Sequence, residues 1–140
     1  MPEAENVARV VREWVAKAEN DLRNAAHSLK LGGDCPTDTV CFHAQQCVEK
    51  YLKAALVDAG IDFPKTHDIE VLLSLLPRKL RVDLEVEQQR QLTQYATGAR
   101  YPFWPDIPLS EARRAVRLAR QVRSQVRKQL PRSALRRQRR

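Results

Sequence analysis

Apolar residues recur at intervals of three and four positions through most of the chain, which is the spacing of amphipathic α-helices. The first such stretch runs from about Glu5 to Leu31. Gly32 and Gly33 follow it, and we expect one of them to adopt the left-handed conformation that ends many helices. The apolar stripe of this helix consists of Val7, Val11, Trp14, Ala18, Leu22, Ala25 and Leu29.

The second stretch, Val40 to Leu56, is the one around which the chain is organised. Thr37 or Asp38 can cap this helix, and it ends at Gly60. Its apolar positions are Val40, Ala44, Cys47, Tyr51 and Ala55, and its polar positions form two adjoining stripes, Gln45, Glu49 and Lys53 beside Gln46 and Lys50. Apolar residues flank these stripes, so we expect the polar groups to be partly enclosed. Enclosed polar groups need partners, which can be other side chains, a second subunit or a ligand.

Three further helices are predicted. Thr66 is expected to cap a short third helix that ends at Pro77. A fourth covers Glu85 to Ala99 with an apolar face of Leu92, Tyr95, Ala96 and Ala99, and a last one, capped by Ser110, covers Glu111 to about Leu130 with Ala112, Ala115, Val116, Ala119, Val122 and Val126. Three prolines make Arg100 to Pro108 a loop. Its Phe103 and Trp104 either pack as core or dock a partner.

This pattern predicts an all-α protein, an up-and-down bundle of four to five helices over residues 1–130. Residues 131–140 form an arginine-rich tail that we expect to be disordered. No apolar run can span a bilayer, and the acidic N-terminus does not resemble a signal peptide, so we expect a cytoplasmic protein that does not contact membranes.

The charge of the chain is unevenly distributed. Residues 1–110 carry thirteen Lys/Arg and sixteen Asp/Glu, whereas residues 111–140 carry twelve Lys/Arg and one acid. An argument for nucleic-acid binding is therefore confined to the C-terminal end, where Arg113, Arg117, Arg120 and Arg127 follow one side of the last helix. The alternative is a solvated face, or a face that grips an acidic protein.

The three cysteines, Cys35, Cys41 and Cys47, favour small buried thiols over a metal site or a disulfide. No histidine stands at a spacing that would complete a zinc site. We therefore expect neither a metal nor a cofactor.

Four blocks of sequence, in order, resemble the HEPN domain (higher eukaryotes and prokaryotes nucleotide-binding). They are W-V-A-K-A-E-N-D-L-R-N-A, F-H-A-Q-Q-C-V-E-K-Y-L-K-A-A-L, K-T-H-D-I-E-V-L-L and Y-A-T-G-A-R-Y-P. The resemblance covers about Trp14 to Arg123. It implies a helical bundle, assembly as a homodimer, a nucleotide or RNA ligand, and a nucleotidyltransferase partner, in some pairs as toxin and antitoxin. It also implies a prokaryotic source.

Many HEPN proteins are metal-independent ribonucleases whose signature is an Arg followed, after four to six residues, by a His. Arg100 matches the arginine of the Arg-Tyr-Pro block in the nucleotide-binding branch, but no His follows it in this sequence. The general acid/base of the ribonuclease is therefore missing, and we expect no chemistry from this chain alone. A divergent ribonuclease that uses His43 or His67 is the alternative, and a non-catalytic interaction module that uses the arginine-rich helix and tail is another.

The residues predicted to bind the ligand are Arg100, Tyr101, Lys50, Lys53, Gln46, Glu49 and His67. Arg100 would hold a phosphate and Tyr101 would stack on a base or ribose. The lysines would meet an anion, and His67, at a helix start, could meet a phosphate. Each has a structural alternative: Arg100 can cap a helix or pair with Glu49, Glu49 and Lys53 can pair with each other, and His67 can complete a cap. Asp21 can pair with Arg100 or with a lysine of the second helix, or be solvated.

Overall fold

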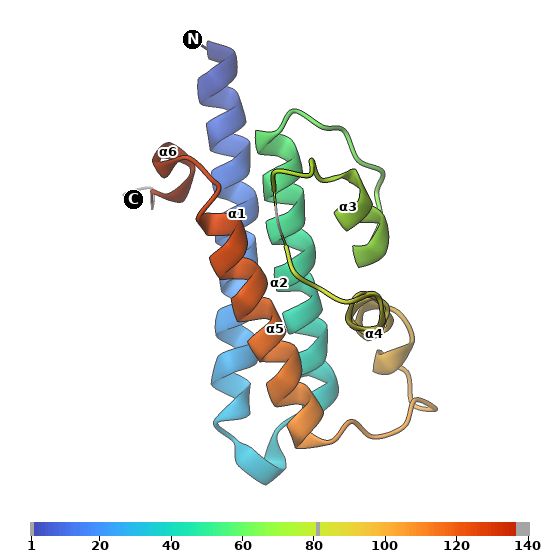
Figure 1. The fold of residues 1–140 in the computed structure, drawn as a ribbon. Helices are drawn as coiled ribbons and strands as arrows, with labels where there is room; N and C mark the ends of the chain where they lie inside the picture. The colour runs from blue at the N-terminus through green and yellow to red at the C-terminus, as the bar shows by residue number, and fades with distance from the viewer. Residues whose placement is uncertain (1, 81, 137–140) are drawn as a thin grey trace.

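The computed structural model describes residues 2–80 and 82–136, without the side chains of residues 2 and 100. Within them the chain forms six α-helices, two short 3₁₀ helices and no strand (Figure 1). The α-helices are α1 (Pro2–Leu29), α2 (Thr37–Asp58), α3 (Ile69–Leu75), α4 (Val86–Ala96), α5 (Leu109–Arg127) and α6 (Arg132–Leu135), and the 3₁₀ helices are η1 (Gly32–Asp34) and η2 (Gly98–Arg100). The predicted all-α bundle is confirmed.

Helix α2 lies at the centre of the bundle. It packs against α1 and α5 on one side and against α3 and α4 on the other (Figure 1). Helices α1 and α2 are antiparallel, and the turn between them contains Gly32 at φ 59°, the left-handed conformation expected at this position. The predicted apolar positions of α2 and α5 are all buried, as are those of the predicted fourth helix. That helix ends at Ala96, however, so the predicted position Ala99 lies in η2 and not in α4.

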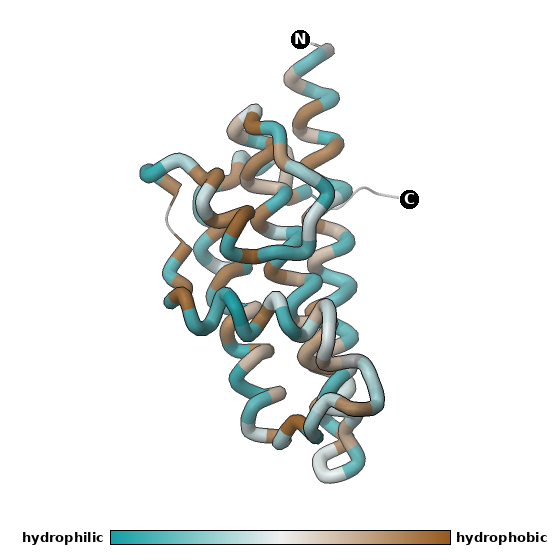
Figure 2. The backbone as a smooth tube through the Cα atoms, turned by 90° about the vertical axis from the view of Figure 1, so that its right-hand side faces the viewer, coloured by the Kyte–Doolittle hydropathy of each residue, from teal (hydrophilic) through white to brown (hydrophobic). Residues whose placement is uncertain are grey.

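Hydrophobic residues recur along the helices among hydrophilic ones (Figure 2). On α1, Val11, Ala18, Leu22 and Ala25 of the predicted stripe are buried, while Trp14 and Leu29 are partly buried. Val7 is 39% exposed, because the first turns of α1 extend beyond the end of α2 (Figure 1). None of the helices in the described residues is long and apolar enough to cross a lipid bilayer.

Three helix starts differ from the prediction. Thr66 does not cap the third helix: its hydroxyl accepts from the Asp68 amide, and Asp68 is the cap, accepting from the Val71 amide. Ser110 lies inside α5, which begins after Pro108. Thr37 is the first residue of α2, and the Asp38 carboxylate accepts from the Thr39 amide, so neither residue caps α2 from outside.

The C-terminal segment also differs from the expected disordered tail. Arg132–Leu135 form α6, and Ala134 is buried against the bundle. Arg12 of α1 holds this segment, since its Nη1 donates to the Ser133 carbonyl at 2.8 Å. Residues 137–140 of the predicted tail lie outside the described residues.

Candidate functional site

Five polar residues form what we call the α2 polar face: Gln45, Gln46, Glu49, Lys53 and His67. Glu49 is at its centre, 3% exposed. Its Oε1 accepts from Gln45 at 3.2 Å and lies 2.7 Å from Nδ1 of His67, and its Oε2 accepts from Lys53 at 3.0 Å. Gln46 donates to Gln45 at 2.7 Å. The expected enclosure is confirmed for Gln45, Glu49 and Lys53, which are buried, whereas the His67 side chain is 62% exposed. The partners of the buried groups belong to the same chain.

Lys53 is held on two sides. Besides its bond to Glu49, its ammonium lies 5.4 Å from the ring centroid of Trp14 and 5.8 Å from that of Phe63. An ammonium over an aromatic face is attracted by the negative charge of that face. The charge of Lys53 is therefore satisfied within the protein and is not displayed to an incoming anion.

Lys50 has a different partner one turn away. Its ammonium lies 2.5 Å from Oδ2 of Asp21, whose other oxygen lies 2.8 Å from Nδ1 of His43. This is one of the two pairings expected for Asp21. Each of the two predicted lysines thus faces a carboxylate, so this side of α2 has little excess positive charge.

The loop after η2 separates its aromatic residues. Tyr101 and Phe103 are exposed and stack on each other, with ring centroids 5.9 Å apart and planes 5° apart. Trp104 turns inward and lies against Gly98. Arg100 ends η2 through its backbone, and its predicted contacts lie outside the described residues, because its side chain is not described.

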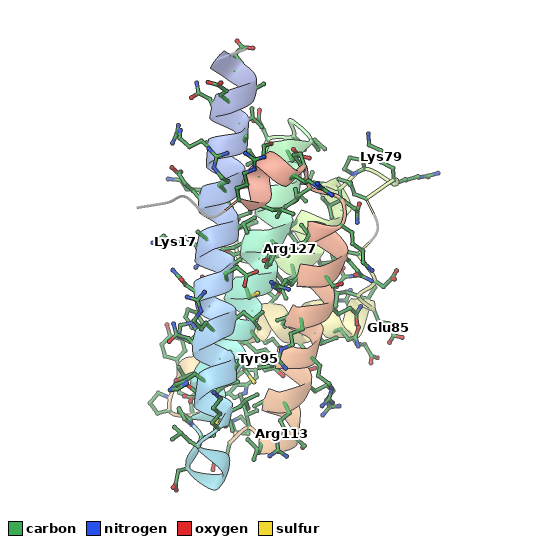
Figure 3. The ribbon with its side chains drawn as sticks, turned by 90° about the vertical axis from the view of Figure 1, so that its left-hand side faces the viewer. Lys17, Lys79, Glu85, Tyr95, Arg113 and Arg127 are labelled. Carbon is green, nitrogen blue, oxygen red and sulfur yellow. The ribbon has the colours of Figure 1, made fainter. Side chains whose placement is uncertain are left out.

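A groove of about 590 Å³ lies between α1, α5 and α6, and we call it the basic groove. Its charged lining comprises Arg9, Arg12, Arg23, Arg123, Arg127 and Arg136, against Glu13 and Glu19. The lining therefore carries six positive and two negative charges. Arg127 projects between α1 and α5 on this side of the molecule (Figure 3).

The arginines of the basic groove differ in how they are held. Arg23 is exposed, with a 3.4 Å bond to the neutral side chain of Asn20, and Arg9 pairs with Glu13 at 2.9 Å near solvent. Arg12 is tied to α6, and its Nε is buried without a hydrogen-bond partner among the described residues.

Glu19 binds the two arginines that α5 contributes to the groove, Arg123 and Arg127. Its Oε1 accepts from Nε of Arg123 at 2.6 Å, from Nη1 of Arg127 at 3.3 Å and from the hydroxyl of Tyr51. Burial raises the pKa of Glu19, but the hydrogen bonds from Tyr51 and Arg123 and the two positive charges outweigh it, so the pKa lies below its ordinary value. Burial and the bond to Glu19 raise the pKa of Tyr51, which stays a hydrogen-bond donor.

Of the four arginines predicted to contact nucleic acid, Arg127 lines the basic groove. Arg113, Arg117 and Arg120 are exposed on α5. Their helical spacing places Arg113 and Arg120 on the same side of α5 as Arg127, and Arg117 further round. Arg113 lies at the opposite end of α5 from α6 (Figure 3). Arg113, Arg120 and Arg127 thus form a row along α5, and this row ends at the basic groove.

The contribution of α1 was missed by reasoning from sequence. Arg9, Arg12, Glu19 and Arg23 follow three-, seven- and four-residue steps, which place them on one side of the helix. This polar stripe beside the apolar one was the available signal. It becomes interpretable only once α1 and α5 are known to lie side by side.

The two buried cysteines are poorly placed for nucleophilic chemistry. Burial raises the pKa of the Cys41 thiol to about 12 and also raises that of Cys47, so neither thiol is activated as a nucleophile. Cys41 and Cys47 are buried, as predicted, whereas Cys35 is only partly buried. The described residues contain no group of three or more histidine, cysteine or acidic side chains placed to hold a metal ion.

Comparisons with known proteins agree with this architecture. The HEPN domain family profile matches residues 11–129. The crystal structure of TT1696 from Thermus thermophilus is similar at 33% sequence identity and a TM-score of 0.69, covering 86% of this chain and 98% of that one. ST0689, an archaeal HEPN homologue, is similar at 27% identity and a TM-score of 0.65, over 85% of this chain and 96% of that one. A search of curated proteins found no match. The chain belongs to the HEPN domain family.

Proposed function

We propose that this HEPN protein binds a phosphate-bearing ligand, RNA or a nucleotide, in the basic groove. The observation that carries the proposal is the lining of the groove, six arginines against two glutamates drawn from α1, α5 and the residue that follows α6. Arginine presents a planar set of donors that matches phosphate oxygens, and a row of such groups follows a nucleic-acid backbone by charge rather than by sequence.

The basic groove is favoured over the α2 polar face as the ligand site. Lys50 and Lys53 each pair with a carboxylate of their own chain, so an incoming phosphate would have to compete with Asp21 or Glu49. Arg23, in contrast, has a neutral partner, and Arg136 is exposed at the edge of the groove. The groove therefore supplies positive charge that the bundle itself does not neutralise.

A nucleotidyltransferase partner, a toxin–antitoxin role and assembly as a homodimer belong to the same proposal. Their support is the membership of the HEPN family together with the expectations stated for it, and not any contact within this chain. The divergent ribonuclease is not favoured. The histidines available to it, His43 and His67, bond to Asp21 and Glu49 on the α2 side of the bundle.

The test is the affinity of the purified protein for an oligoribonucleotide, measured at several salt concentrations. Arg23→Ala should weaken binding and lower the slope of log affinity against log salt by about 1, because one phosphate contact is lost. Arg23 is exposed, so the variant should fold. Arg78→Ala is the matched control: Arg78 is an exposed arginine next to Lys79, which points away from α1 (Figure 3). Equal binding by the two variants would refute the assignment.

A further inference from the structure

The floor of the basic groove is an oxyanion site that the protein fills with its own carboxylate. A single oxygen, Oε1 of Glu19, accepts hydrogen bonds from Arg123, Arg127 and Tyr51. Two of these donors are guanidinium groups of α5, and the third is a hydroxyl of α2. Such charge-assisted donors would equally suit the oxygen of a phosphate.

Of the three donors to Glu19, only the Tyr51 hydroxyl does not line the groove. The Glu19 carboxylate lines the groove together with Arg123 and Arg127, whereas Tyr51 is fully buried. The Glu19 side chain is 24% exposed, and a glutamate on a helix surface can move aside by changing rotamer without moving the backbone. Tyr51 cannot move in this way, since its ring is enclosed by the core. Departure of the carboxylate would therefore leave three donors at the floor of the groove.

We propose that Glu19 is a specificity-determining residue that excludes ligands with one phosphate and admits a strand with several. This inference rests on the proposed function of the groove. To reach these three donors, a single phosphate must displace the carboxylate that they hold, and it gains only those donors in return. An RNA strand also meets Arg9, Arg23 and Arg136, and linked contacts strengthen one another because the later ones form within a complex that already exists.

The experiment compares Glu19→Gln with Glu13→Gln, using adenosine monophosphate and an oligoribonucleotide of about ten nucleotides as probes. Both variants remove one negative charge from the lining of the groove, but only Glu19 occupies the donors of Arg123 and Tyr51. The affinity of Glu19→Gln for the monophosphate should rise at least about tenfold, because a neutral amide competes more weakly for guanidinium groups. Glu13→Gln should change it by no more than about twofold, since its pair with Arg9 is exposed and screened by salt.

Equal gains in the two variants, or no gain in Glu19→Gln, would overturn the inference. If Glu19→Gln fails to fold, Glu19→Asp replaces it, because aspartate keeps the charge but is too short to hold all three donors. It should also gain affinity for the monophosphate, and the absence of that gain would overturn the inference.

The oligoribonucleotide separates this inference from the proposed function. If the wild-type protein binds it in a way that needs Arg23, while the two glutamine variants bind the monophosphate equally, the role of Glu19 alone is refuted. If no variant binds either probe, both proposals fail.

Discussion

Nε of Arg123 lies 2.6 Å from Oε1 of Glu19, a residue 104 positions earlier in the chain. The same oxygen accepts from Tyr51, so one carboxylate links α1, α2 and α5. Because Arg123 and Arg127 both depend on it, the protonation state of Glu19 bears on the packing of the bundle as well as on the groove. Its titration should therefore be visible in the stability of the whole protein.

The first prediction concerns acid stability. The pKa of Glu19 is lowered from its ordinary value of 4.5, so the unfolded chain binds this proton more readily than the folded one. The stabilisation that ionised Glu19 gives to the folded state is therefore present above pH 4.5, the ordinary pKa. It is lost as the pH falls through the lower pKa that Glu19 has in the folded state. Urea unfolding from about pH 6 to about pH 3 measures it.

Glu19→Gln is the control for this titration. It lacks the ionisable group, so the difference in unfolding free energy between the wild type and the variant should narrow as the pH falls. A difference that stays constant across this range would show that Glu19 does not titrate differently in the folded state.

The second prediction concerns the buried pair of Lys53 and Glu49. Lys53→Met should lower the free energy of unfolding by about 3 kcal/mol, because it leaves a buried carboxylate without its cation. The Glu49 side chain is 4% exposed, so water cannot replace the ammonium. Denaturant unfolding of this variant, of Glu49→Gln and of the double variant gives the coupling energy of the pair.

Arg9 and Glu13 supply the matched comparison. They are also four residues apart on a helix, but their side chains are 50% and 63% exposed. Arg9→Met should therefore cost no more than about 0.5 kcal/mol. If Arg9→Met and Lys53→Met lowered the free energy of unfolding equally, the burial of the Lys53–Glu49 pair would not add to its contribution to stability.

The third prediction concerns the close approach at Gly98. A Cβ added there would lie 2.9 Å from Cζ3 of Trp104, which is too short for two carbon atoms. Gly98→Ala should lower the free energy of unfolding by about 1–3 kcal/mol, because the indole ring must shift. Thermal or urea unfolding measures the loss, and Trp104→Leu in the same background should restore part of it.

Gly33→Ala is the control for Gly98→Ala. Nothing lies within 4 Å of a Cβ at Gly33, and its backbone is not left-handed. The free energy of unfolding of Gly33→Ala should be unchanged or raised by up to about 1 kcal/mol, because alanine restricts the conformations of the unfolded chain. A loss at Gly33 as large as that at Gly98 would refute the steric explanation.

The helices could be predicted from sequence because each one buries a single regular stripe. Ala112 to Val126 on α5 is an example, since every predicted apolar residue there is buried. The enclosure of Glu49 was also predictable, because apolar residues flank it on the same helix. These features depend on spacing within one element, which the sequence displays directly.

The basic groove was not predictable in the same way. It requires Arg23 of α1, Arg123 of α5 and Leu135 of α6 to meet, and their distance in sequence carries no information about that meeting. The separate pairing of Lys50 and Lys53 has a similar cause. The two residues are neighbours on α2, but Lys50 pairs with Asp21 of α1, whereas Lys53 pairs with Glu49 of α2 itself.

The start of α3 shows how two polar residues that are two positions apart can be confused, and it leads to the last prediction. Asp68 accepts from the Val71 amide at 3.2 Å, which is the cap bond, whereas Thr66 accepts from the Asp68 amide at 3.0 Å and so shapes the turn before the helix. Asp68→Ala should cost about 1 kcal/mol, because an amide of the first turn loses its partner. Thr66→Ala should cost less, since a hydroxyl holds a turn more weakly.

Hydrogen exchange at the Val71 amide distinguishes the two roles. Asp68→Ala should speed exchange at Val71, since local opening of the first turn of α3 becomes easier. In Thr66→Ala the Asp68 carboxylate is still present, so exchange at Val71 should stay near the wild-type rate. If Thr66→Ala were the variant that released Val71, Thr66 would be the cap after all, and α3 would begin earlier in solution than it does in this structure.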